Sequence, residues 1–206
     1  MLTFHEVTAE DGRWAQPLLW QSGYCSCEYS FVNIFMWSHV YHTSIARYGD
    51  WVVARSEGPS SLHYLFPAGH GDEKAVLGEI IQDAHAMGKR LVLFSLSDAA
   101  KLRLESYFPG VFCFEDARDD YDYLYSAEEL ALLPGKKFQK KRNHVSRFIK
   151  DNPDWQFHPI TPDSMQAIRR FNNEWCNLYD NRDDAGIAAE HRAIELAFRH
   201  YDSLGL

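Results

Sequence analysis

Hydrophobic and polar positions recur with two different periods along this chain, which predicts a mixed α+β fold. Short apolar or alternating stretches bounded by turn residues are typical of β-strands. The predicted strands are residues 2–7, 51–54, 63–66, 91–94, 111–114, 121–125 and 155–160. Apolar residues three and four positions apart predict helices between residues 8 and 23, 30 and 41, 72 and 88, 97 and 109, 126 and 134, 135 and 150, and 161 and 201. The residues predicted to cap helices are Thr8, Ser97 or Asp98, Ser126 and Thr161.

The order strand, cap and helix opens the chain and recurs from residue 155, which indicates the beginning of a second unit. A polar break at 180–184 divides its helical part. We therefore expect a mixed sheet flanked by helices, followed by the incomplete start of a second such domain. The predicted domains are residues 1–134, a basic connecting helix at 135–152, and 153–206. Since the last part has no sheet of its own, either the chain is truncated after Leu206 or its last helices pack on the first domain.

Composition favours a packed protein in a reducing compartment. The 206 residues are 46% hydrophobic and 15% aromatic, which is ample for a core. No apolar run approaches the roughly 18 residues that span a bilayer. The four cysteines lack zinc-ligand spacing, and no secretory signal opens the chain, so we expect free thiols. These observations predict a cytoplasmic protein with no transmembrane segment, which touches a membrane surface at most as a peripheral protein.

Charge is distributed unevenly, because a chain of net charge −8 carries seven Lys or Arg and no acid at residues 135–150. Such a segment indicates an anionic partner, either tRNA or an anionic phospholipid headgroup. A solvated helix that balances the acidic run at 115–122 is the alternative. On a helical projection Phe138, Val145 and Ile149 form an apolar stripe, with Phe148 at its edge, which we expect to face a core.

The polar residues of this helix divide into two groups around that stripe. One group lies on the opposite side and comprises Lys136, Lys140, Asn143, Arg147 and Lys150. Lys141 and Arg142 flank the stripe, and a cation beside a buried face is usually paired or directed at a ligand. Arg142, with its planar fork of donors, is the first candidate for an anion contact.

Two other segments are candidate binding sites. Gly69, His70 and Gly71 lie between a strand and a helix, where backbone N–H groups hold phosphate, although a turn that requires glycine is the commoner explanation. Asn33 shares a helix face with Trp37 and Tyr41, and it is either a pocket residue or part of a core seam. The histidines lack companion carboxylates, so no metal site is predicted. Asp119, Asp120 and Asp122 are general-base candidates, but turn residues are the favoured interpretation.

Four segments resemble the family related to the C-terminal catalytic domain of phosphatidylglycerol lysyltransferase, and together they cover nearly the whole chain. They are Ser30–Trp37, Phe66–Asp72, Asp122–Tyr125 and the most specific one, Gly135–His144. The resemblance implies tandem acyltransferase-like folds of the Gcn5-related N-acetyltransferase type, which are also found in Fem-type aminoacyltransferases. Those relatives move an aminoacyl group from aminoacyl-tRNA to a lipid or cell-wall precursor. Unlike this chain, the lipid-modifying members carry membrane helices, and their second domain continues beyond the position of Leu206.

The resemblance also implies roles for individual residues. The basic residues would handle an anionic substrate; they are Lys136, Lys137, Lys140, Lys141, Arg142 and Arg147, with Asn143 beside them. Two interpretations follow. In the first, the protein is an acyl or aminoacyl transferase that takes its donor from aminoacyl-tRNA or acyl-CoA, with Gly69–Gly71 as cofactor loop and Tyr125 or His144 as candidates for proton transfer. In the second, the protein is a non-catalytic anion-binding module or an inactive fragment.

Overall fold

The computed structural model describes residues 1–179 and 185–206, and its contacts divide the chain into two compact units. Unit 1 comprises Met1–Ala117 together with Arg169–Leu206, and unit 2 comprises Arg118–Ile168. The predicted polar break at 180–184 lies outside the described residues. The domain limits inferred from the sequence remain predictions, although the two compact units group the residues differently.

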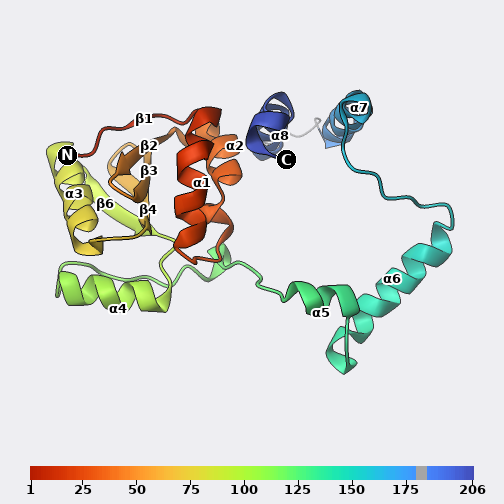
Figure 1. Ribbon diagram of the computed structural model, residues 1–206, viewed down its shortest axis with the longest axis horizontal. Helices are drawn as coiled ribbons and strands as arrows, with labels where there is room; N and C mark the ends of the chain where they lie inside the picture. Colours follow the sequence, from red (N-terminus) through yellow and green to blue (C-terminus); the bar gives the residue numbers. More distant parts are fainter. Residues whose placement is uncertain (180–184) are drawn as a thin grey trace. The chain divides into compact units, whose positions relative to one another are not determined.

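A mixed β-sheet forms the centre of unit 1 (Figure 1). Its strands follow one another in the spatial order β1 (His5–Glu6), β2 (Thr43–Tyr48), β3 (Trp51–Glu57), β4 (Ser61–Leu65) and β6 (Arg90–Phe94). Neighbours from β1 to β4 are antiparallel, whereas β4 and β6 are parallel. A parallel pair needs a crossover, and helix α3 (Glu73–Ala86) supplies it. The mixed sheet flanked by helices agrees with the α+β fold predicted from the sequence.

A two-residue strand, β5 (Ala68–Gly69), adds to the sheet where the sequence predicted only a loop. It pairs with the beginning of β3, while β4 pairs with the end of β3. Pro67 lies between β4 and β5, and because proline has no N–H it interrupts the ladder at this point. Strand β3 therefore pairs with β5 and β4 one after the other along the same edge.

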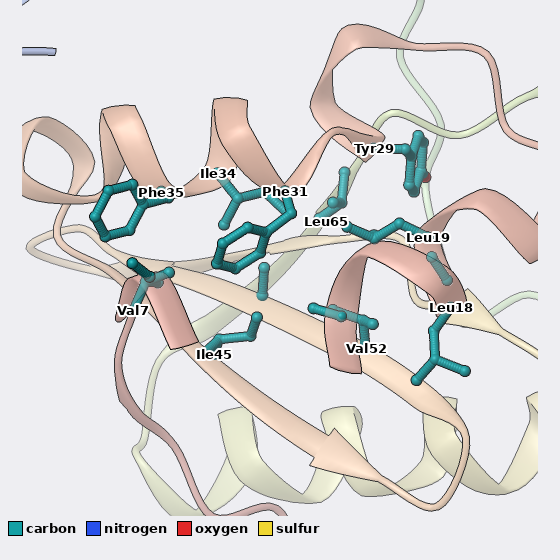
Figure 2. Close-up of a cluster of buried hydrophobic side chains, with 14 residues drawn as sticks. Val7, Leu18, Leu19, Tyr29, Phe31, Ile34, Phe35, Ile45, Val52 and Leu65 are labelled. Carbon is teal, nitrogen blue, oxygen red and sulfur yellow. The ribbon is translucent and has the colours of Figure 1, made fainter. Parts of the chain in front are cut away.

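Helices cover both faces of the sheet (Figure 1). Helices α1 (Gly12–Gln21) and α2 (Phe31–Tyr41) lie on one face, and α3 packs against the other. The first core cluster contains side chains from both helices and the sheet, and Figure 2 labels Val7, Leu18, Leu19, Tyr29, Phe31, Ile34, Phe35, Ile45, Val52 and Leu65. Helix α4 (Asp98–Tyr107), capped by Ser97, packs Ala100 and Leu104 on α3. The predicted helices at 30–41 and after Asp72 are thereby confirmed.

The last helices pack on unit 1, as one of the two sequence alternatives proposed. Helix α8 (Ala185–Arg199) contacts α2, and α9 (Tyr201–Leu204) contacts the 3₁₀ helix η1 (Ala9–Asp11). The His200 and Phe35 rings meet edge to face with centroids 5.1 Å apart. Helix α7 (Pro162–Tyr179) begins after Thr161, whose hydroxyl accepts a hydrogen bond from the Ser164 N–H as predicted for a cap.

Three predicted strands were wrong, because residues 111–114, 121–125 and 155–160 adopt no strand. The first two surround an aspartate cluster, a residue type that strands disfavour, and part of this cluster forms the 3₁₀ helix η3 (Arg118–Asp120). The third contains Pro159, which cannot donate to a ladder. An alternating pattern forms a strand only where another strand is available, and none of these segments pairs with one in the described part of the chain.

Unit 2 consists of short helices, and one of them is the predicted basic helix. They are η3, α5 (Ala127–Leu132), η4 (Lys136–Phe138), α6 (Gln139–Asp151) and the beginning of α7. The Ser126 hydroxyl caps α5 by accepting from the Glu129 N–H, as predicted. The apolar stripe of α6 was expected to face a core, but within unit 2 only Phe138 is buried.

Candidate functional site

One side of α6 presents exposed cations. Lys140 and Lys150 of α6, and Lys136 of the preceding η4, are exposed and make no ion pair among the described residues. Arg147 lies 3.4 Å from Asp151, one turn later, in an exposed pair of small energetic value. This side therefore offers cations that remain available to a phosphate-bearing partner.

Arg142 has a different environment from its neighbours, because its guanidinium closes the turn between α5 and α6. It donates to the carbonyl oxygens of Leu133 and Gly135, the latter at 2.7 Å, and to Gln139 Oε1 at 2.6 Å. Leu133 is the left-handed C-cap of α5, where carbonyls lack helical partners. This half-buried cation is thus paired with main-chain carbonyls. Its assignment to a substrate anion stays a prediction.

Two further lysines connect α6 and η4 to the preceding segment. Lys137 Nζ lies 2.6 Å from a carboxylate oxygen of Glu129, and Lys141 Nζ lies 5.2 Å from the centroid of the Tyr125 ring. Tyr125, one of the predicted proton-transfer residues, is therefore held beside a cation. The other candidate, His144, is exposed on α6. Asn143 accepts from the Gln139 side chain at 2.9 Å.

The Gly69–Gly71 segment is in unit 1, and its geometry gives Gly69 a structural explanation. A Cβ at Gly69 would lie 2.0 Å from the carbonyl oxygen of Asp50, so only glycine fits between β5 and the β2–β3 turn. His70 Nε2 lies 3.5 Å from an Asp50 carboxylate oxygen. Asp72 caps α3 through the Ala75 N–H, which places a carboxylate at the helix N-terminus where a phosphate was predicted.

Asn33 lies on α2 in unit 1 and is half-buried, with no side-chain hydrogen bond to any described residue. Phe31, the first residue of the same helix, donates its N–H to Gln16 Oε1 of α1 at 3.0 Å. Gln16 Nε2 has no partner among the described residues. Asn33 therefore stays a candidate pocket residue. Unit 1 holds Asn33 and the glycine segment, and unit 2 holds the basic helix.

A partly buried polar cluster beside the carboxyl ends of β4 and β6 was not predicted. Arg103 of α4 makes a two-pronged ion pair with Glu73 at 2.8 and 2.9 Å and also donates to the Tyr24 hydroxyl at 3.0 Å. The Glu73 carboxylate raises the pKa of Arg103, and burial raises that of Tyr24. No local motif could have revealed these partners, since they are 30 and 79 residues apart in sequence.

Tyr29 completes this cluster from the 3₁₀ helix η2 (Cys27–Tyr29). Its ring lies 4.6 Å from that of Tyr24, and its hydroxyl lies 3.0 Å from the Ser95 carbonyl and 3.3 Å from that of Phe66. Burial raises the pKa of Tyr29, so this hydroxyl stays a neutral donor. The Tyr29 hydroxyl therefore lies against the main-chain carbonyls that follow β4 and β6.

The described residues contain no group of three or more His, Cys, Asp or Glu placed to hold a metal ion. Among the same residues, no helix combines the length and the apolar character needed to cross a bilayer. None of the four cysteines forms a disulfide bond within the described part of the chain.

The fold and the site define an α+β protein with a mixed helix-flanked sheet and an exposed cationic helix. The chain belongs to the family described as phosphatidylglycerol lysyltransferase, C-terminal, whose model matches residues 23–206. It is also similar to a conserved protein of unknown function from Bacteroides thetaiotaomicron VPI-5482, with 34% sequence identity and a TM-score of 0.92. That match covers 100% of this chain and 69% of the other. None of the curated proteins matches this chain.

Proposed function

We propose that this protein acts in aminoacyl transfer, with aminoacyl-tRNA as donor and an amine or hydroxyl as acceptor. The observation that carries the proposal is the exposed cationic side of α6, in a chain that belongs to a lysyltransferase family. Lys136, Lys140 and Lys150 have no competing carboxylate among the described residues. A row of unpaired cations binds a phosphate backbone through charge and counterion release.

The contacts around α3 favour tRNA over acyl-CoA as the donor. A pyrophosphate at the Gly69–Gly71 segment would meet the carboxylate of Asp72, which caps α3. Like charges oppose such binding. We therefore propose that the donor binds at the cationic side of α6. Binding of acyl-CoA remains one of the outcomes of the test.

The proposed step is a direct attack on the aminoacyl ester. The acceptor nitrogen or oxygen forms a bond to the ester carbonyl carbon, the bond from that carbon to the ribose oxygen breaks, and the acceptor proton ends on the released ribose oxygen. Tyr125 and His144 are the candidates for carrying this proton, and we propose no covalent enzyme intermediate. Much of the rate would come from positioning the two substrates.

The test is a filter-binding titration with charged and uncharged tRNA at two salt concentrations, followed by assay for loss of the ester. Lys140→Gln should weaken tRNA binding and reduce the salt slope by about 1, the contribution of one phosphate contact. Glu128→Gln, a charge change on α5, is the matched control and should leave the slope unchanged.

Substitution of Arg142 distinguishes a transferase from a module that only binds anions. If its guanidinium contacts the donor as well as the carbonyls, Arg142→Lys should reduce transfer far more than Lys140→Gln does, with unchanged helical content by circular dichroism. Equal, modest losses in binding with no transfer would instead support the non-catalytic anion-binding module. Binding of acyl-CoA without any binding of tRNA would contradict the proposal.

A further inference from the structure

The segment that joins α1 to α2 carries two cysteines that the proposed function does not use. Cys25 and Cys27 are separated by Ser26 alone, and both residues are exposed. They stand two residues apart in one segment of unit 1, so the local backbone sets the distance between them, and no residue of unit 2 is involved. We name Cys25 and Cys27 the cysteine pair.

The ends of this segment are held in place on both sides of the cysteine pair. The rings of Tyr24 and Tyr29 lie 4.6 Å apart. The Tyr24 hydroxyl accepts a hydrogen bond from Arg103 at 3.0 Å, and the Tyr29 hydroxyl donates to main-chain carbonyls. A segment with fixed ends has already lost most of its conformational freedom, so joining two of its side chains costs little further entropy.

The backbone of Ser26 keeps the two cysteines just within reach of each other. Its φ of −73° and ψ of 147° are extended. At about 3.1 Å of rise per residue, this conformation places the Cα atoms of Cys25 and Cys27 roughly 6.5 Å apart. Disulfides accept Cα distances up to about 6.8 Å. A bond between the two sulfur atoms is therefore feasible, but it is strained unless the backbone of Ser26 rotates.

Rotation at Ser26 would act on the 3₁₀ helix η2, because Ser26 is its N-cap. The Ser26 hydroxyl accepts from the Glu28 N–H at 3.3 Å, and the Ser26 carbonyl accepts from the Tyr29 N–H at 3.1 Å. A disulfide would pull on both hydrogen bonds. Its formation is therefore coupled to the position of Tyr29 beside Tyr24.

We propose that the cysteine pair is a reversible thiol–disulfide site that reacts with small-molecule disulfides such as oxidised glutathione. The thiolate of one cysteine attacks a sulfur of the small disulfide, and one small thiol leaves. The second cysteine then attacks the sulfur of the first, and the second small thiol leaves. Two cysteine thiols are oxidised to one disulfide, one small disulfide is reduced to two thiols, and the two protons pass to those thiols.

The strain in the product makes the reaction reversible. Strained or exposed disulfides are the easily reduced ones, which serve regulatory or catalytic roles more often than structural ones. Oxidation would loosen η2, and reduction would restore it. This site goes beyond the proposed function and does not depend on it, since its reaction needs neither tRNA nor an acceptor.

The experiment is treatment of the 206-residue chain with oxidised glutathione, followed by alkylation of the remaining thiols, trypsin digestion and mass spectrometry. Cleavage after Lys and Arg leaves both cysteines, and no other cysteine, in the peptide Trp14–Arg47. We expect most of this peptide to be unalkylated and lighter by two hydrogen atoms. Excess reduced glutathione should restore both thiols.

Single variants distinguish a pair from two independent thiols. Cys25→Ser and Cys27→Ser should each stop at the mixed disulfide with glutathione, because the second thiol is missing. Cys113→Ser is the matched control, since it removes an exposed cysteine from another tryptic peptide, and it should form the internal disulfide like the unmodified chain.

Hydrogen exchange tests the coupling to η2. Oxidation should make the Tyr29 amide exchange severalfold faster, because its hydrogen bond to Ser26 is weakened. Four results would overturn the proposal: no reaction of the cysteine pair, a mixed disulfide with glutathione as the final product, a disulfide that joins Cys25 or Cys27 to another cysteine, or an internal disulfide that leaves exchange of the Tyr29 amide unchanged.

Discussion

Substituting Gly69 by alanine tests whether this glycine serves the sheet or a ligand. The new Cβ would lie 2.0 Å from the Asp50 carbonyl oxygen and 2.8 Å from the Trp51 Cα, and both atoms are main chain. Ordinary contacts begin near 3.4 Å, so the two strands must separate by more than an ångström. Separation disrupts the β3–β5 pairing and the 3.2 Å hydrogen bond from the His70 N–H to Asp50.

The magnitude follows from three contributions. Overpacking costs about 1–3 kcal/mol, the φ of 150° that suits only glycine adds about 1–3 kcal/mol, and each lost hydrogen bond adds about 1 kcal/mol. We expect a loss of about 4 kcal/mol in the free energy of unfolding. For a chain of this size that corresponds to a fall of about 8–16 °C in Tm.

The assay is thermal unfolding followed by circular dichroism, with Gly88→Ala as the matched control. Gly88 also has a positive φ, 62°, but nothing lies within 4 Å of its Cβ position. Gly88→Ala should therefore show only the left-handed backbone cost of about 1–2 kcal/mol. Equal shifts in Tm for the two variants would refute the steric argument. Equal shifts with loss of ligand binding only in Gly69→Ala would favour the phosphate-loop hypothesis.

Three further variants test contacts in unit 1. Tyr29→Phe removes the hydroxyl shared by two main-chain carbonyls and should cost about 1–3 kcal/mol in urea unfolding, because buried acceptors lose their donor; an unchanged midpoint would contradict this. Burial raises the pKa of Asp11, but hydrogen bonds from Thr8, His5 and Trp14 outweigh it and lower the pKa below the ordinary 3.8. The stability that ionised Asp11 supplies is fully present above the ordinary pKa and is lost as the pH falls through the lowered pKa. Asp11→Asn should therefore lower the free energy of unfolding at pH 7, and in acid its free energy of unfolding should approach that of the unmodified protein. Arg103→Lys keeps the charge but loses the two-pronged ion pair with Glu73, so the amide hydrogen-exchange rates of α4 should rise. Rates equal to those of the unmodified protein would contradict a stabilising role for this ion pair.

The elements that the sequence predicted well are those fixed by local signals. Helix α2 follows from its apolar spacing, and Ser126 and Thr161 cap the helices that they were expected to cap. Because Arg142 borders an apolar stripe, it was expected to be either paired or directed at an anionic ligand, and the structure pairs it with carbonyls at the end of α5. Amphipathic position indicates that a cation needs partners, but the identity of those partners depends on the fold of the preceding turn.

The features that the sequence could not predict depend on contacts between residues that are far apart along the chain. The alternation at 121–125 resembles a strand, yet strand formation requires a partner elsewhere in the chain. The role of Gly69 depends on its distance to Asp50, and the ion pair between Arg103 and Glu73 depends on the packing of α4 beside α3. Neither relation leaves a periodic pattern. Likewise, hydrophobic spacing located the apolar side of α6, but the core that it was expected to face is absent within unit 2, where Val145, Phe148 and Ile149 are about half exposed.

The packing of α8 on α2 has a consequence for how unit 1 is assembled. Unit 1 is built from two separate stretches of chain with residues 118–168 between them, and Phe35 meets His200 from nearly opposite ends of the sequence. During synthesis the sheet and its first helices can form while the surface of α2 awaits its cover, because α8 leaves the ribosome much later. Closing so long a loop slows folding more than it lowers stability. The nascent chain should therefore pass through a stage with an exposed apolar helix surface, at which chaperone binding and aggregation compete with completion of the fold.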